Sequence, residues 1–80
     1  MNKEVFEELK EIILDYLGED DMEISEESTL NEDLGLTSLD MISVIGEIED
    51  KFNIQMEDET MYSIKTVKDA VDYIYGKIER

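Results

Sequence analysis

The sequence contains no Cys, His, Pro or Trp among its 80 residues. Without Cys it can form neither a disulfide nor a thiolate metal site. Without His it lacks the usual general base for a serine nucleophile. The absence of Pro suits a helical protein with few rigid turns. These absences argue against thiolate metal chemistry and against a hydrolase that activates serine with His.

Positive charge is also scarce, with 7 Lys and Arg against 23 Asp and Glu and a net charge of −16. Residues 11–50 hold fourteen of the acidic residues and no Lys or Arg. Such a field repels nucleic-acid phosphates and anionic membranes, and it attracts basic protein surfaces. We therefore expect protein partners with basic docking surfaces, and neither nucleic acid nor membrane. Self-repulsion should weaken the fold, so salt or divalent cations should stabilise it.

Long apolar runs are absent too. No stretch approaches the roughly 20 apolar residues of a membrane-spanning helix, and the N-terminus lacks the pattern of a signal peptide. The length and a hydrophobic share of 41% predict one compact domain, residues 1–80, near the lower size limit for a single core. We expect a cytoplasmic monomer.

Apolar residues that recur at spacings of three and four predict helices. The first spans residues 3–17 and ends at Gly18, with apolar positions at Val5, Phe6, Leu9, Ile12, Ile13, Tyr16 and Leu17. A second begins at Ser38 and stops near Asn53. A short third covers residues 59–64, and Thr66 caps a last helix with a buried face of Val67, Ala70, Val71, Ile74 and Ile78. No strand pattern is present, so we predict an all-α fold, a four-helix bundle with one short helix.

Residues 18–37 show no sustained periodicity. A loop of about twenty residues in a small domain is normally functional or packed against the core. Five apolar residues are spaced so that they could pin it there: Met22, Ile24, Leu30, Leu34 and Leu36. We expect an ordered crossing connection, with a short turn of helix near residues 30–33.

The second helix has more apolar positions than one buried face needs. We expect its buried stripe to be Ile42, Ile45, Ile48 and Phe52. Leu39 lies off that stripe and is expected to be an exposed docking point. Met41 and Val44 either share that role or are buried against the long loop.

Ser38 is the residue at the start of this helix that could carry chemistry. Thr37 can cap the helix with Asp40 in a capping box, and the alternative for Ser38 is that it too is only a capping residue. A catalytic serine is disfavoured, since residues 11–50 supply no His or Lys as base. We therefore predict no catalytic residue.

The acidic loop also invites comparison with a calcium-binding EF-hand. Aligning Thr29, Asn31 and Asp33 as ligands puts Leu34 where a Gly is needed and Asp40 where a Glu is needed. We therefore predict no metal site.

The octapeptide at residues 33–40, Asp-Leu-Gly-Leu-Thr-Ser-Leu-Asp, precedes an acidic helix that ends Glu-Asp-Lys-Phe. With the helices on either side, it resembles the acyl carrier proteins over nearly the whole chain. The resemblance implies that Ser38 carries 4′-phosphopantetheine, transferred from coenzyme A by a phosphopantetheinyl transferase. It also implies a recognition surface for acyl-transferring and acyl-elongating enzymes, made of Leu39, Asp40, Glu47, Glu49 and Asp50. The stripe of Ile42, Ile45, Ile48 and Phe52 would line the interior that shelters acyl chains.

The function implied is that of a stand-alone carrier, not an enzyme, which moves acyl thioesters between enzymes of fatty acid or polyketide-type biosynthesis. Two residues depart from the family pattern: Thr37 stands where Asp is usual, and Gly46 stands where a larger apolar residue, often Met, is common. Two alternatives remain open. One is an aminoacyl, peptidyl or D-alanyl carrier, and the other is an unmodified acidic helical adaptor that binds a basic partner.

Overall fold

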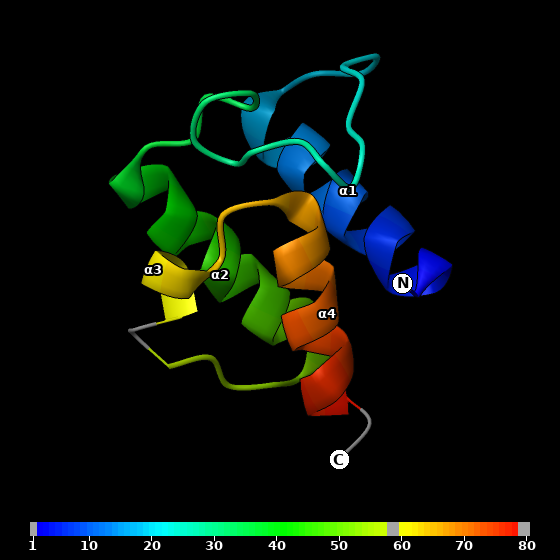
Figure 1. Ribbon diagram of the computed structural model, residues 1–80, viewed down its shortest axis with the longest axis vertical. Helices are drawn as coiled ribbons and strands as arrows, with labels where there is room; N and C mark the ends of the chain where they lie inside the picture. The colour runs from blue at the N-terminus through cyan, green and yellow to red at the C-terminus, as the bar shows by residue number, and fades with distance from the viewer. Residues whose placement is uncertain (1, 58–59, 79–80) are drawn as a thin grey trace.

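The computed structural model describes residues 2–57 and 60–78, and the helices account for most of them (Figure 1). In chain order they are α1 (Lys3–Leu17), α2 (Ser38–Phe52), α3 (Thr60–Ser63) and α4 (Val67–Ile78). The described residues contain no strand, only an isolated bridge between Thr29 and Thr66. The predicted all-α fold is confirmed, with three long helices and a single turn, α3, inside the predicted range 59–64, whose first residue lies outside the described part.

α1 begins and ends where local chemistry predicts. The side chain of Asn2 accepts a hydrogen bond from the Val5 amide at 2.9 Å, which satisfies a donor in the first turn. Gly18 ends the helix with a φ of 71°, a left-handed conformation that glycine adopts without the steric cost of a side chain. The Gly18 amide bonds back to carbonyls of the last turn. The predicted span 3–17 is confirmed.

α2 and α4 begin with the same device, a Thr followed three residues later by an Asp. In α4, Thr66 Oγ1 accepts from the Asp69 amide at 3.2 Å, and Asp69 Oδ2 accepts from the Thr66 amide at 3.2 Å. Asp69 Oδ2 also accepts from the Lys65 amide, and these backbone donors lower the pKa of Asp69. The predicted Thr37–Asp40 capping box is present, the Thr66 cap forms the same box with Asp69, and Asn53 ends α2 with a φ of 55°.

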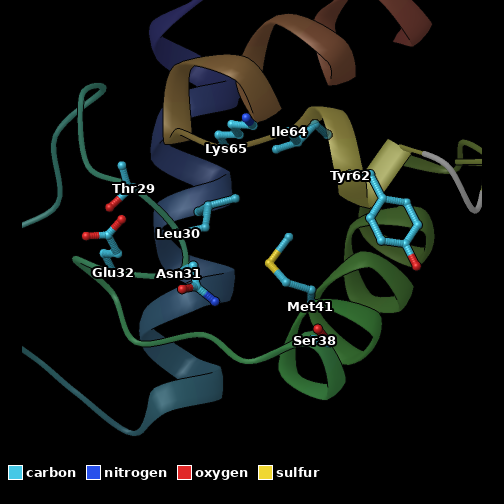
Figure 2. A pocket seen from close by; sticks show the side chains of 9 residues that line it. All are labelled: Thr29, Leu30, Asn31, Glu32, Ser38, Met41, Tyr62, Ile64 and Lys65. Atoms are coloured by element: carbon cyan, nitrogen blue, oxygen red, sulfur yellow. The ribbon is translucent and has the colours of Figure 1, made fainter.

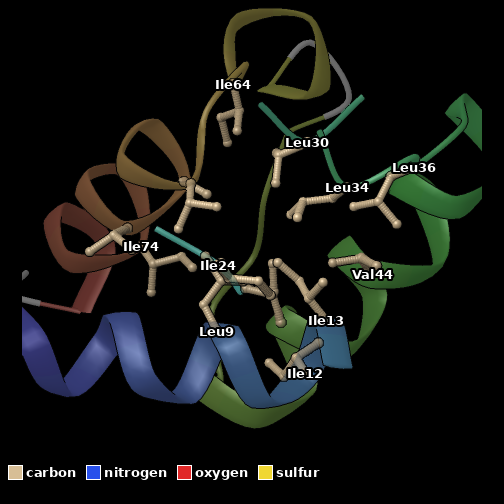
Figure 3. Close-up of a cluster of buried hydrophobic side chains, with 14 of the residues drawn as sticks. Leu9, Ile12, Ile13, Ile24, Leu30, Leu34, Leu36, Val44, Ile64 and Ile74 are labelled. Atoms are coloured by element: carbon tan, nitrogen blue, oxygen red, sulfur yellow. The ribbon is translucent and has the colours of Figure 1, made fainter. Parts of the chain in front are cut away.

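α1 packs against both α2 and α4, and residues 18–37 cross one end of the bundle (Figure 1). The core lies between the helices and this crossing loop (Figure 3). Its buried side chains come from α1, α2 and α4, from the crossing loop and from the α2–α4 connection. They are Val5, Leu9, Ile12, Ile13, Ile24, Leu30, Leu34, Leu36, Val44, Ile48, Met56, Ile64, Val67, Ala70, Val71 and Ile74.

The crossing loop is held by backbone hydrogen bonds as well as by its apolar side chains. The Leu30 amide donates to the Lys65 carbonyl at 2.9 Å, and the Val67 amide donates to the Ser28 carbonyl at 3.0 Å. Residues 30–33 form the expected turn, in which the Asp33 amide donates to the Thr29 carbonyl at 3.1 Å. The prediction of an ordered connection pinned to the core is confirmed. These hydrogen bonds therefore link the crossing loop, which leads into α2, to the segment that leads into α4.

The buried face of α2 differs from the predicted one. Ile42, predicted in the interior stripe, is 57% exposed, whereas Val44 is only 3% exposed. Ile48 is buried as predicted, and Met41, Ile45 and Phe52 pack partly buried against the core. Apolar residues surround much of this helix, so the crossing loop and α1 select which of them are covered. In α4, Ile78 is likewise 43% exposed because it lies at the end of the helix.

Candidate functional site

Ser38 is the first residue of α2, and its side chain is exposed. The residue before it, Thr37, has extended backbone angles, φ −83° and ψ 176°, so the chain turns sharply into the helix. Thr37 Oγ1 accepts from the Asp40 amide at 3.2 Å, and Asp40 Oδ2 accepts from the Thr37 amide at 2.9 Å. These reciprocal bonds fix the residues on both sides of Ser38 and leave its hydroxyl accessible.

The approach to Ser38 depends on Gly35. Leu34 and Leu36, on either side of Gly35, are both buried. Gly35 has a φ of 72°, a left-handed conformation that glycine adopts without the steric cost of a side chain. Both leucines therefore anchor the segment that leads into Thr37 and Ser38.

Asp40 has a second partner outside its own helix. Tyr16 Oη, in the last turn of α1, donates to Asp40 Oδ1 at 2.5 Å. The Thr37 backbone bond, followed by the Tyr16 bond, holds the pKa of Asp40 below its usual value, because both stabilise the carboxylate. The same bond to Asp40 raises the pKa of Tyr16. Asp40 thus has one oxygen bound within the cap and the other bound to α1.

A pocket of about 370 Å³ opens beside Ser38 (Figure 2). The crossing loop forms one wall, α2 forms another, and α3 with the segment after it forms the third. Its lining residues are Thr29, Leu30, Asn31, Glu32, Ser38, Met41, Tyr62, Ile64 and Lys65. Asn31 Nδ2 donates to the Leu36 carbonyl at 3.0 Å, which holds the loop wall in place. The Met41 side chain projects between Ser38 and Ile64 (Figure 2). The part of the pocket between Ser38 and Ile64 is therefore apolar, whereas the wall formed by the crossing loop is polar.

Lys65 also lines this pocket, although its position in the sequence does not indicate that it lies near Ser38. The sequence argument against a catalytic serine considered residues 11–50, but the fold brings a lysine from the α3–α4 connection to the same pocket. Lys65 lies on the opposite side of the pocket from Ser38 (Figure 2), and no hydrogen bond joins the two described side chains. The arrangement therefore offers Ser38 no hydrogen-bonded base.

The five residues predicted for partner recognition differ in how far their side chains are exposed to a partner. Leu39 is 77% exposed, and Glu47 and Asp50 are exposed as well. Glu49 is only half-exposed, and its Oε2 accepts from the Met56 amide at 2.8 Å, which holds the turn after α2. Asp40 is half-exposed with both carboxylate oxygens hydrogen-bonded. Ile42, expected inside, instead lies with Leu39 on the outer face of α2, and its exposure follows from how α1 and the crossing loop pack against that helix.

Comparison with known proteins agrees with this geometry. Residues 7–74 match the family model described as the phosphopantetheine attachment site. The chain is 44% identical over 75 residues to an acyl carrier protein of Clostridium acetobutylicum, covering 94% of this chain and 97% of that one. An acyl carrier protein of Wolinella succinogenes is 41% identical over 70 residues, covering 88% and 92%. The chain belongs to the acyl carrier protein family.

The fold agrees as well. The crystal structure of an acyl carrier protein from Thermotoga maritima matches with a TM-score of 0.84 and 35% identity, covering 96% of this chain and 89% of that one. This carrier therefore bears acyl groups on covalently attached 4′-phosphopantetheine. Its relatives favour an acyl carrier over an aminoacyl or peptidyl carrier and over an unmodified adaptor.

The residues around Ser38 fit such a group. The side chain is exposed at the N-terminal end of α2, where free backbone amides and the helix dipole favour a negatively charged phosphate. The pocket that Ser38 lines has room beside the helix for part of a flexible arm or its cargo. When bound, the group supplies a terminal thiol that holds acyl groups as thioesters.

Proposed function

We propose that Ser38 is the residue to which phosphopantetheine is attached. The observation that carries this proposal is an exposed serine at the first position of α2, held by the Thr37–Asp40 capping box beside a partly apolar pocket. Ser38 also lies inside the matched region, residues 7–74. Thr37 keeps the capping role here, so the turn does not depend on an acidic residue at that position.

Attachment breaks a phosphoanhydride bond in coenzyme A and forms a phosphate ester bond to Ser38. The Ser38 hydroxyl oxygen attacks the phosphopantetheine phosphorus of coenzyme A, and the bond to the departing adenosine bisphosphate breaks. The hydroxyl proton passes to a base supplied by the phosphopantetheinyl transferase, since Ser38 has no hydrogen-bonded base of its own. This protein is therefore a substrate of the transferase and a carrier of the attached group, and we propose that it is not an enzyme.

The biological setting proposed is fatty acid or polyketide-type biosynthesis in the cytoplasm. A flexible arm on a small domain raises the effective concentration of cargo at each enzyme, towards the mM range for a short tether. No helix in the described ranges, 2–57 and 60–78, is long and apolar enough to cross a membrane.

We propose that partner enzymes dock on the outer face of α2. Leu39 and Ile42 supply exposed apolar contacts, and Glu47 and Asp50 supply negative charge on the same helix. Basic partner surfaces would then be attracted over a distance and held by the apolar pair at contact. Asp40 and Glu49, both hydrogen-bonded within the chain, would support this face and contribute less to contact.

The test is the intact mass after incubation with coenzyme A, magnesium and a broad-specificity phosphopantetheinyl transferase. Wild type and Ser43→Ala, which changes another exposed serine of α2, should each gain one phosphopantetheinyl unit. Ser38→Ala should gain none while it keeps the wild-type circular dichroism spectrum, because the Thr37–Asp40 box does not use the Ser38 side chain. Modification of Ser38→Ala would refute the assignment. Absence of any gain in wild type with several transferases would instead support the unmodified adaptor.

A further inference from the structure

Tyr16 contacts the segment that holds Ser38 from a distant part of the chain. It lies in the last turn of α1, 24 residues before Asp40, and its hydroxyl donates to Asp40 Oδ1 at 2.5 Å. The residue is 36% exposed, so its ring is partly covered while its hydroxyl reaches the start of α2. A hydrogen bond to a carboxylate is shorter and stronger than one between neutral groups. Tyr16 is thus a directional link from α1 to this turn.

Asp40 passes this link on to the residue that precedes Ser38. While Oδ1 accepts from Tyr16, Oδ2 accepts from the Thr37 amide at 2.9 Å, and the Thr37 hydroxyl accepts from the Asp40 amide at 3.2 Å. A continuous series of hydrogen bonds therefore runs from α1 through Asp40 to Thr37. Ser38 lies between the two residues of α2's cap that this series holds.

A hydrogen bond from another helix can reduce the motion of the first turn of a helix. Its amides have no partners within the helix, and helix ends open more readily than helix centres. A nucleophile that must meet the substrate of another enzyme loses rate when it is displaced by about 1 Å. A capping box alone fixes the turn within α2, whereas the Tyr16 bond fixes it relative to α1.

We propose that Tyr16 is a positioning residue for Ser38, holding the first turn of α2 against α1 through Asp40 so that the hydroxyl is presented to the transferase in one orientation. This inference rests on the proposed attachment at Ser38. It assigns a role in modification to a residue of α1, outside the motif at residues 33–40 and outside the outer face of α2. Tyr16 acts through Asp40 and need not touch coenzyme A.

The kinetic experiment compares Tyr16→Phe with Tyr75→Phe. The control removes the hydroxyl of a similarly exposed tyrosine on α4. With a phosphopantetheinyl transferase and saturating coenzyme A, we expect kcat for Tyr16→Phe to fall roughly three- to tenfold, with KM for the carrier within about twofold of wild type. Tyr75→Phe should match wild type in both constants.

Two kinetic outcomes would overturn the inference. A rise in KM at unchanged kcat would mean that Tyr16 contacts the transferase directly. Unchanged constants in Tyr16→Phe would mean that the hydrogen bond has no part in presenting Ser38.

A second measurement on the unmodified protein separates this inference from the proposed attachment itself. In Tyr16→Phe, amide hydrogen exchange at Thr37 and Asp40 should be roughly three- to tenfold faster than in Tyr75→Phe. The pKa of Asp40, followed by NMR, should rise because its carboxylate loses a donor. Equal acceleration throughout the chain would show general destabilisation and refute a local role. A wild-type protein that no transferase modifies would refute the attachment at Ser38, whatever the exchange result.

Discussion

At the scale of single residues, Gly46 stands out because the fold does not require it. It lies in the middle of α2 on the exposed side, and a β-carbon built there meets no atom within 4 Å. Its backbone is helical, without the positive φ that Gly18 and Gly35 need. Glycine inside a helix is less favourable than alanine by about 1 kcal/mol. Its presence on the proposed docking face leaves that part of α2 flat between larger side chains.

Gly46→Ala should therefore stabilise the fold by about 0.5–1 kcal/mol. In a domain of this size that is a rise in Tm of roughly 3–6 °C, measurable by circular dichroism. Gly18→Ala is the matched control, because its φ of 71° strains any other residue, and it should lower the Tm. A fall in Tm for Gly46→Ala would mean that the helix is constrained at this position in a way its surroundings do not show.

At the scale of elements, the crossing loop behaves as part of the core. Leu36 at its end is 1% exposed, whereas Leu39, three residues later in α2, is 77% exposed. The two leucines flank Thr37 and Ser38 and have opposite environments. One therefore anchors the element that carries the serine, and the other is available to a partner.

This contrast predicts different effects of the same substitution. Leu36→Ala should destabilise the fold by about 2–5 kcal/mol, because it removes buried contacts and leaves a cavity. Leu39→Ala should change stability by no more than about 0.5 kcal/mol, yet weaken docking to partner enzymes. Urea denaturation of the two variants measures the first effect, and KM in the transferase assay measures the second. Similar losses of stability would contradict the arrangement of this segment.

At the scale of the whole molecule, charge dominates. The net charge is −16 in a chain of 80 residues, and the described residues contain a single salt bridge, the exposed pair Lys68–Asp72. No group of three or more acidic residues in the described part is arranged to hold a metal ion. Repulsion is therefore spread over the surface and is relieved by diffuse screening.

Raising NaCl from about 10 mM to about 300 mM shortens the screening length from roughly 30 Å to below 10 Å and should raise the Tm. Tetramethylammonium chloride is the control, since its bulky cation screens charge without coordinating carboxylates. Differential scanning calorimetry should give similar increases with both salts. A large increase with sodium only would indicate a specific cation site, and a fall in Tm would contradict the repulsion argument.

Much of this protein could be predicted from sequence because the deciding interactions are local. The end of α1, both ends of α2 and the start of α4 follow from Gly18, Asn53 and the two Thr–Asp capping boxes, each formed within a few residues of chain. The position of Ser38 at the start of α2 follows from the same local chemistry. The ordering of the long loop follows from the spacing of its apolar residues.

Other features were decided only when distant segments met. The face of α2 that is buried could not be chosen from a helix with apolar residues on several sides, and packing covered Val44 and left Ile42 outside. Spacing along the chain did not indicate that Lys65 would share a pocket with Ser38. Spacing along the chain also did not indicate the hydrogen bond from Tyr16 to Asp40. Periodicity and capping are properties of neighbouring residues, whereas burial and contacts between elements depend on which surfaces the fold brings together.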